Sequence, residues 1–170
     1  MNPEPETMNS ERRSHPPHTL ILALGNPLRG DDGVGLAVLD ALRARALPPQ
    51  VALVDGGTSG LELVLTMQGC QRVIVIDAAE MGSTPGTWRQ FTPDDVRLQA
   101  RDPHLGGTLH YAGFAEALVL AEALGLLPPE IIVFGVQPVE IDWRPGLSDP
   151  VRAAVEPLAQ TIAQIVTDGG

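Results

Sequence analysis

Short apolar runs alternate with amphipathic segments along the chain from residue 19 onward. The runs at 19–24, 51–54 and 72–76 are almost wholly apolar, as in strands that are buried on both faces of a parallel sheet. Between them, over about 33–45 and 59–69, apolar residues recur at helical spacing. The first half of the chain therefore predicts a strand–helix–strand–helix–strand series, which is typical of α/β proteins.

The second half continues this pattern with one change of direction. The run from Thr87 to Phe91 predicts a strand, and the turn at 82–86 that precedes it is too short for a crossover, so we expect an antiparallel edge strand. A loop is expected over about 92–109. A helix should follow over 110–127 and end at Pro128-Pro129, before a strand at 131–135. The closing helix should span about 150–166, with Ser148 or Asp149 as its N-cap.

These elements predict an α/β fold, a three-layer αβα sandwich on a five-stranded, mostly parallel sheet with one antiparallel edge strand. With 170 residues, 44% of them hydrophobic, residues 19–170 are expected to form a single domain. Residues 1–18 are polar and contain prolines, and are expected to form a disordered tail without a signal-peptide core.

Charge and cysteine content narrow the classes of function. A net charge of −10 argues against nucleic acid or an anionic membrane as the partner, since both require clustered basic residues. The single cysteine, Cys70, excludes an internal disulfide framework and is best interpreted as structural. No apolar stretch reaches the roughly 18 residues of a membrane span. We therefore expect a cytoplasmic protein.

The loop after the first strand, GNPLRGDDGVG, has the spacing of a phosphate-binding loop but the wrong charge. The spacing Gly25-x4-Gly30 matches the opening of a P-loop, yet Asp31 and Asp32 stand where lysine and a hydroxyl are required. The dinucleotide fingerprint fails as well, because Pro27 occupies the place of its second glycine. Carboxylates here suit a cation or a general base, although an N-cap role alone would also explain either aspartate.

The other unusual polar residues also follow the strands, at the sheet edge where α/β proteins bind ligands. Asp55 precedes two glycines, a position where an aspartate is more often a turn residue than a ligand. Asp77 ends the apolar run VIVI, so its buried carboxylate needs a partner or a metal. With His110 these side chains would give two oxygens and one imidazole, an incomplete ligand set for a divalent transition metal. The remaining candidates at this edge are Asn26, Gln137 and Glu140.

The segments LALGNPLRGDDGVG, DGGTSGLEL, VIVIDA, His110 at a helix start, and FGVQP followed by GLS occur in a specific order. In that order they resemble the hydrogenase maturation endopeptidases, over about residues 19–166. That family trims a C-terminal extension from the large subunit of nickel-iron hydrogenases after nickel insertion. The resemblance implies an aspartic-type, nickel-dependent endopeptidase whose nickel is supplied by the precursor, its substrate and partner.

The resemblance also implies site residues. Asp32, Asp77 and His110 correspond to the metal ligands, and Asp32 is the shorter of the two carboxylates that the family uses at its position. Asp55 corresponds to an aspartate that supports catalysis or substrate binding, and Asp32 or Asp55 is expected to activate water ahead of Asp31. Contacts to the substrate are expected from Asn26, Gln137 and Glu140.

Two alternatives remain open. Ser59, Asp77 and His110 occur in the order of an α/β-hydrolase triad, but Gly57-Thr58-Ser59-Gly60-Leu61 lacks the second glycine of G-x-S-x-G, and Ser59 is also well placed as an N-cap. The other alternative is a non-enzymatic nickel carrier or hydrogenase chaperone that uses the same three ligands and leaves the length of the precursor unchanged.

Overall fold

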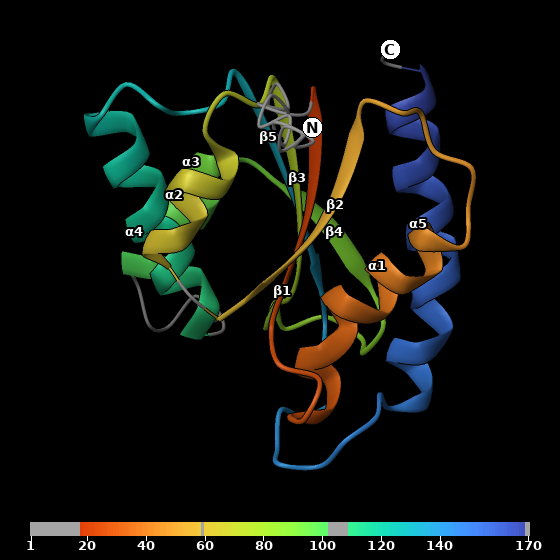
Figure 1. Ribbon diagram of the computed structural model, residues 1–170. Coiled ribbons are helices and arrows are strands. Elements are labelled where there is room, and N and C mark those ends of the chain that lie inside the picture. Colours follow the sequence, from red (N-terminus) through yellow and green to blue (C-terminus); the bar gives the residue numbers. More distant parts are fainter. Residues whose placement is uncertain (1–17, 59, 102–108, 169–170) are drawn as a thin grey trace, which may run out of the picture.

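The computed structural model describes residues 18–58, 60–101 and 109–168 (Figure 1). The strands are β1 (Thr19–Leu24), β2 (Val51–Gly57), β3 (Arg72–Ala78), β4 (Trp88–Phe91) and β5 (Glu130–Val136). The helices are α1 (Val34–Arg43), α2 (Leu61–Met67), α3 (Pro93–Arg101), α4 (Leu109–Ala123) and α5 (Asp149–Asp168), and a 3-10 turn, η1 (Gly30–Gly33), precedes α1.

The strands form one five-stranded sheet in the order β2-β1-β3-β5-β4. β1 runs parallel to β2 and β3, β3 runs parallel to β5, and β4 pairs antiparallel with β5 at the edge. The predicted α/β class, the mostly parallel sheet and the single antiparallel edge strand are therefore confirmed. The observed strands β2, β3 and β5 extend beyond the predicted ranges at their carboxyl ends, where the candidate site residues lie.

Both faces of the sheet are covered, which explains why apolar residues stand at successive positions in the middle of β1, β3 and β5. Leu20, Leu22 and Leu24 point to the core shared with α2 and α4, whereas Ile21 and Ala23 point to the core shared with α1 and α5. Figure 1 shows α2, α3 and α4 on one side of the sheet and α1 and α5 on the other. Among the described helices, none is long and apolar enough to cross a membrane.

The strand order creates a topological switch point between β1 and β3. The chain passes from β1 through α1 to β2 on one side, then returns through α2 to β3 on the other side of β1. Connections that leave neighbouring strands over opposite faces open a crevice at the carboxyl ends of those strands. Gly35 brings the start of α1 onto this edge, because a Cβ there would lie 2.6 Å from the carbonyl oxygens of both Leu24 and Ile76.

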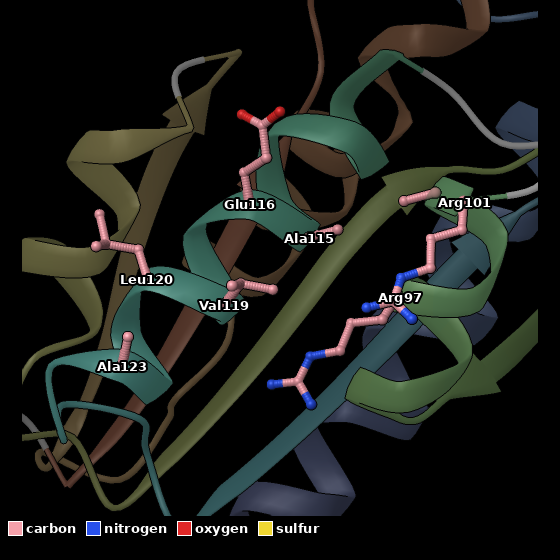
Figure 2. A pocket seen from close by; sticks show the side chains of 8 residues that line it. Arg97, Arg101, Ala115, Glu116, Val119, Leu120 and Ala123 are labelled. Atoms are coloured by element: carbon pink, nitrogen blue, oxygen red, sulfur yellow. The ribbon is translucent and has the colours of Figure 1, made fainter.

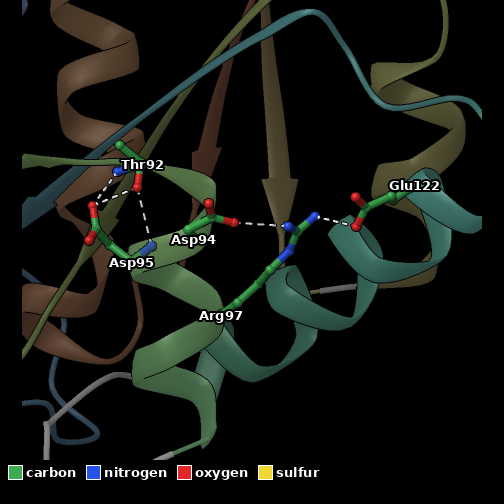
Figure 3. A network of polar contacts seen from close by, with 5 residues as sticks. All are labelled: Thr92, Asp94, Asp95, Arg97 and Glu122. Carbon is green, nitrogen blue, oxygen red and sulfur yellow. Dashed lines mark hydrogen bonds and ion pairs between the residues drawn. The ribbon is translucent and has the colours of Figure 1, made fainter.

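The predicted loop over 92–109 is wrong in part, because α3 occupies residues 93–101. α3 lies beside α4, and a groove of about 440 Å³ separates them (Figure 2). The groove is lined by Arg97, Ala100, Arg101, Ala115, Glu116, Val119, Leu120 and Ala123. Arg97 of α3 ties the two helices together through its ion pair to Glu122 of α4 (2.9 Å), and it also pairs with Asp94 within α3 (3.0 Å), as Figure 3 shows.

A capping box begins α3 (Figure 3). Thr92 Oγ1 accepts a hydrogen bond from Asp95 N at 3.2 Å, and Asp95 Oδ2 accepts from Thr92 N at 2.8 Å and from Thr92 Oγ1 at 2.7 Å. These bonds lower the pKa of Asp95, and the hydrogen bond from Thr92 N has a larger effect than the one from the Thr92 hydroxyl. The cap therefore contributes stability above the ordinary carboxyl pKa and loses it as pH falls through the lowered pKa.

The predicted boundary of the N-terminal tail is wrong by one residue. The carbonyl oxygen of His18 accepts hydrogen bonds from Gln71 N and Arg72 N, each at 3.0 Å. His18 therefore belongs to the folded domain, directly before β1. Residues 1–17 lie outside the described residues.

Candidate functional site

Asp32 and Asp77 are completely buried at the carboxyl ends of β1 and β3, on either side of the switch point. Asp32 Oδ2 accepts a hydrogen bond from Asn26 N at 2.9 Å, and Asp77 Oδ1 accepts one from Ala78 N at 2.8 Å. The N-cap hypothesis for Asp32 is wrong, because α1 begins at Val34 with Gly33 in the cap position. Its carboxylate instead turns back across the first loop.

The first turn of α4 reaches the same edge of the sheet. Leu24 at the end of β1, Gly57 at the end of β2 and Gly113 of α4 line one small cavity of about 10 Å³. His110 is the second residue of α4, three positions before Gly113. The His110 side chain lies outside the described residues. Among the described side chains, no three metal-binding residues form a cluster; the ligand set Asp32, Asp77 and His110 therefore stays a prediction.

Asp31 does not act as an N-cap either. This buried carboxylate accepts hydrogen bonds from Val139 N (2.8 Å), Ser148 N (2.7 Å) and Ser148 Oγ (2.8 Å). It therefore fastens both ends of the loop 139–148 to η1, the turn that also carries Asp32. Ser148 directly precedes α5, which is the position predicted for an N-cap. Its hydroxyl, however, donates a hydrogen bond to Asp31.

Replacing Asp31 by asparagine should lower the free energy of unfolding by about 2–3 kcal/mol, because an amide NH₂ would face backbone donors that now bind a carboxylate. Chemical denaturation measures the change. Asp149→Asn is the matched control, since Asp149 is an exposed carboxylate paired with Arg152 at the same end of the loop. Equal stability of the Asp31 and Asp149 variants would show that the three hydrogen bonds do not hold the loop.

The other predicted site residues lie at the same edge in different environments. Asp55 is exposed, and its Oδ1 accepts from Gly57 N at 2.9 Å, as in a turn. Asn26 Oδ1 accepts from Leu28 N at 2.9 Å. Exposed Glu140 forms an ion pair with Arg144 at 2.8 Å. Catalytic support by Asp55 and substrate contacts by Asn26 and Glu140 stay predictions.

Gln137 is buried and forms hydrogen bonds at both ends of its amide. Its Oε1 accepts from Met81 N (2.7 Å) and Ser83 N (3.1 Å), and its Nε2 donates to Glu80 Oε1 (2.9 Å) and the Pro138 carbonyl (3.1 Å). These bonds join the segment 80–83, which follows β3, to Gln137 directly after β5. A substrate contact by Gln137, which stays a prediction, would require one of them to be exchanged.

Of the remaining residues singled out in the sequence, Cys70 can be placed and Ser59 cannot. Cys70 is buried, and burial raises the pKa of its thiol, which agrees with a structural role. Ser59 lies outside the described residues. α2 begins at Leu61 with Gly60 in the cap position, so the N-cap expected at Ser59 is displaced by one residue.

Sequence reasoning missed the contact between Arg29 and Trp143. The Arg29 guanidinium lies over the Trp143 ring, 5.6 Å from its centroid. The loop 139–148 is also fastened at its middle, because Gly30 N donates to the Arg144 carbonyl at 2.7 Å. No spacing rule links these residues, since they are far apart in the chain and meet only through the sheet order.

Known proteins are similar to this chain in both sequence and fold. The family model for hydrogenase maturation proteases (HycI) matches residues 36–165. The hydrogenase expression/formation protein HoxM of Azotobacter vinelandii is 37% identical over 160 residues, which cover 91% of this chain and 74% of HoxM. The hydrogenase 2 maturation protease of Escherichia coli K12 is 29% identical over 153 residues, covering 89% of this chain and 92% of that protein.

Solved structures of hydrogenase maturation proteases have a similar fold. The hydrogenase maturating endopeptidase HybD from E. coli superposes with a TM-score of 0.81 at 28% identity, covering 90% of this chain and 94% of HybD. The [NiFe] hydrogenase maturation protease HybD from Thermococcus kodakarensis superposes with a TM-score of 0.72 at 27% identity, covering 88% of this chain and 99% of that structure. The chain therefore belongs to the hydrogenase maturation protease family, whose members are peptide hydrolases.

Proposed function

We propose that this protein removes the C-terminal extension of a nickel-iron hydrogenase large-subunit precursor after nickel has been inserted. The observation that carries this proposal is the pair of completely buried carboxylates, Asp32 and Asp77, at the switch point of the sheet. Burying two carboxylates at one edge costs free energy that apolar side chains would not. A functional role explains the pair better than a contribution to stability does.

The chemistry of the proposed ligands suits nickel that arrives with the substrate. Two carboxylates and the imidazole of His110 would supply oxygen and nitrogen donors to a divalent transition metal. The hydrogen bonds from Asn26 N and Ala78 N orient the two carboxylates. Three protein ligands leave coordination positions open, which the precursor would fill. We therefore propose that the nickel is cargo of the precursor, which the enzyme recognises.

Asp32 and Asp55 are our candidates for activating the attacking water, in an aspartic-type mechanism. Asp32, like Asp77, is completely buried at the carboxyl edge of the sheet, and Asp55 lies exposed near the end of β2. Asp31 is less suited, because both of its oxygens accept hydrogen bonds from the loop 139–148. We place the reaction in the cytoplasm, where a lone buried thiol such as Cys70 would stay reduced.

Incubation of the purified protein with candidate nickel-loaded precursors tests the proposal. The mass of the large subunit should fall by the mass of the extension. A carrier or chaperone would leave the mass unchanged. A serine-directed covalent inhibitor should have no effect on cleavage, whereas loss of cleavage with labelling of Ser59 would favour a serine hydrolase.

Deleting residues 1–17 should leave precursor cleavage within about twofold of the full chain, because a polar tail without apolar anchors contributes little to stability. The described fold begins with His18, whose carbonyl bonds to Gln71 N and Arg72 N. The comparison uses kcat/KM and the melting temperature of both forms. Loss of cleavage at an unchanged melting temperature would show that the tail takes part in binding the substrate.

A further inference from the structure

Arg29 is not compensated by any acidic side chain of the described chain. Among the described residues, its side chain forms no hydrogen bond or ion pair and lies over the face of Trp143, which is 73% exposed. Its Nε is buried without a hydrogen-bond partner among the described residues. Most other described arginines pair with carboxylates: Arg43, Arg45, Arg72, Arg97, Arg144 and Arg152. An uncompensated arginine is unexpected in a chain with a net charge of −10.

The acidic residues closest to Arg29 along these loops have other partners. Asp31 accepts from Val139 and Ser148, and Glu140 pairs with Arg144. Asp142 Oδ1 accepts from the backbone N–H of Trp143 at 2.7 Å. The charge of Arg29 is therefore available to an anion that the described residues do not supply.

The surroundings hold Arg29 in a defined place. The loop that carries Trp143 is fastened to η1 at both ends through Asp31 and at its middle through Gly30. A guanidinium stacked on an aromatic face keeps its in-plane N–H groups directed outward. Those N–H groups match the two oxygens of a carboxylate in a bidentate pair.

Arg29 lies in the same turn as Asp32, the proposed catalytic residue. Asp32 N donates to the Arg29 carbonyl at 3.3 Å, so both residues belong to one short turn. We propose that Arg29, stacked on Trp143, binds a carboxylate of the peptide substrate beside the scissile bond. This inference rests on the proposed function, since it names a substrate feature read by the same site. The carboxylate has two possible sources, an acidic side chain near the cleavage point or the terminal α-carboxylate of the extension.

The test measures Kd and cleavage kinetics for the nickel-loaded precursor with the full-length protein and its Arg29→Gln variant. We expect Arg29→Gln to raise Kd and KM about tenfold or more and to change kcat less, because the lost pair acts in binding. Trp143→Leu, which keeps Arg29 but removes the stacked ring, should shift KM in the same direction. Arg89→Gln is the matched control, since Arg89 is an exposed arginine of β4 with no recorded carboxylate partner, and it should leave Kd and KM unchanged.

Two altered precursors identify the source of the carboxylate. One has the acidic side chains near the cleavage point changed to amides, and the other ends in a C-terminal amide. One of them should weaken binding to the wild-type protein as much as Arg29→Gln does, without a further loss in the Arg29→Gln variant. An unchanged Kd for Arg29→Gln, or losses that simply add, would overturn the inference. Binding without cleavage by the wild type would instead refute the proposed function, while the Kd comparison would still decide the role of Arg29.

Discussion

Replacing Asp77 by asparagine is expected to reduce kcat/KM for precursor cleavage by on the order of 10²-fold or more. Asp77 is completely buried at the end of β3, and asparagine fills nearly the same volume and can still accept from Ala78 N. The variant therefore loses the charge at the site but keeps most of the packing. The rate is measured from the mass shift of the nickel-loaded precursor, and folding is measured by thermal unfolding.

Asp40→Asn is the control for Asp77→Asn. Asp40 is an exposed carboxylate of α1 that pairs with Arg43, and its replacement should leave cleavage unchanged. Asp32→Asn and His110→Ala should follow Asp77→Asn if the three residues act as one ligand set. A large loss of melting temperature in all three variants would instead assign them structural roles. Normal cleavage by Asp77→Asn would contradict the proposed site.

Gly25→Ala should lower the free energy of unfolding by about 3 kcal/mol or more, the second large effect that we expect. Gly25 has φ = +110°, and a Cβ there would lie 2.0 Å from the Asp32 carbonyl oxygen. This contact involves backbone on both sides, so a side-chain rotation cannot relieve it. The first loop would have to move away from the end of β1, and cleavage should fall together with stability.

Gly125→Ala separates the cost of a positive φ from the cost of the close approach to Asp32. Gly125 also has a positive φ, +67°, but no atom lies within 4 Å of its added Cβ. Its replacement should cost about 1–2 kcal/mol from the left-handed backbone alone. Chemical denaturation of both variants gives the difference. Equal costs would show that the close approach of Gly25 to Asp32 is not tightly packed.

The fold was predictable because the burial of both sheet faces gives each central strand an uninterrupted apolar run. α3 was missed for the opposite reason. Only Val96 is buried on this short helix, so no apolar period reveals it. A signal was present in Thr92-Pro93-Asp94-Asp95, which combines the capping box with proline at the first helical position.

The site was predictable where a single residue carries the signal. Asp77 follows directly from the run VIVI, because a strand position fixes its burial. The adjacent aspartates could not be told apart, since η1 directs Asp31 toward the loop 139–148 and Asp32 toward Asn26. The internal role of Gln137 and the stacking of Arg29 on Trp143 depend on loops that meet only in the folded protein.

The most direct test of the central claim compares one precursor with and without nickel at equal enzyme concentration. Two carboxylates and one imidazole are too few ligands to enclose an ion, so the loaded precursor should complete the site. We expect the mass shift of the large subunit only for the nickel-loaded form, and for neither form with Asp32→Ala or His110→Ala. Equal cleavage of both forms by the wild-type protein would contradict the account.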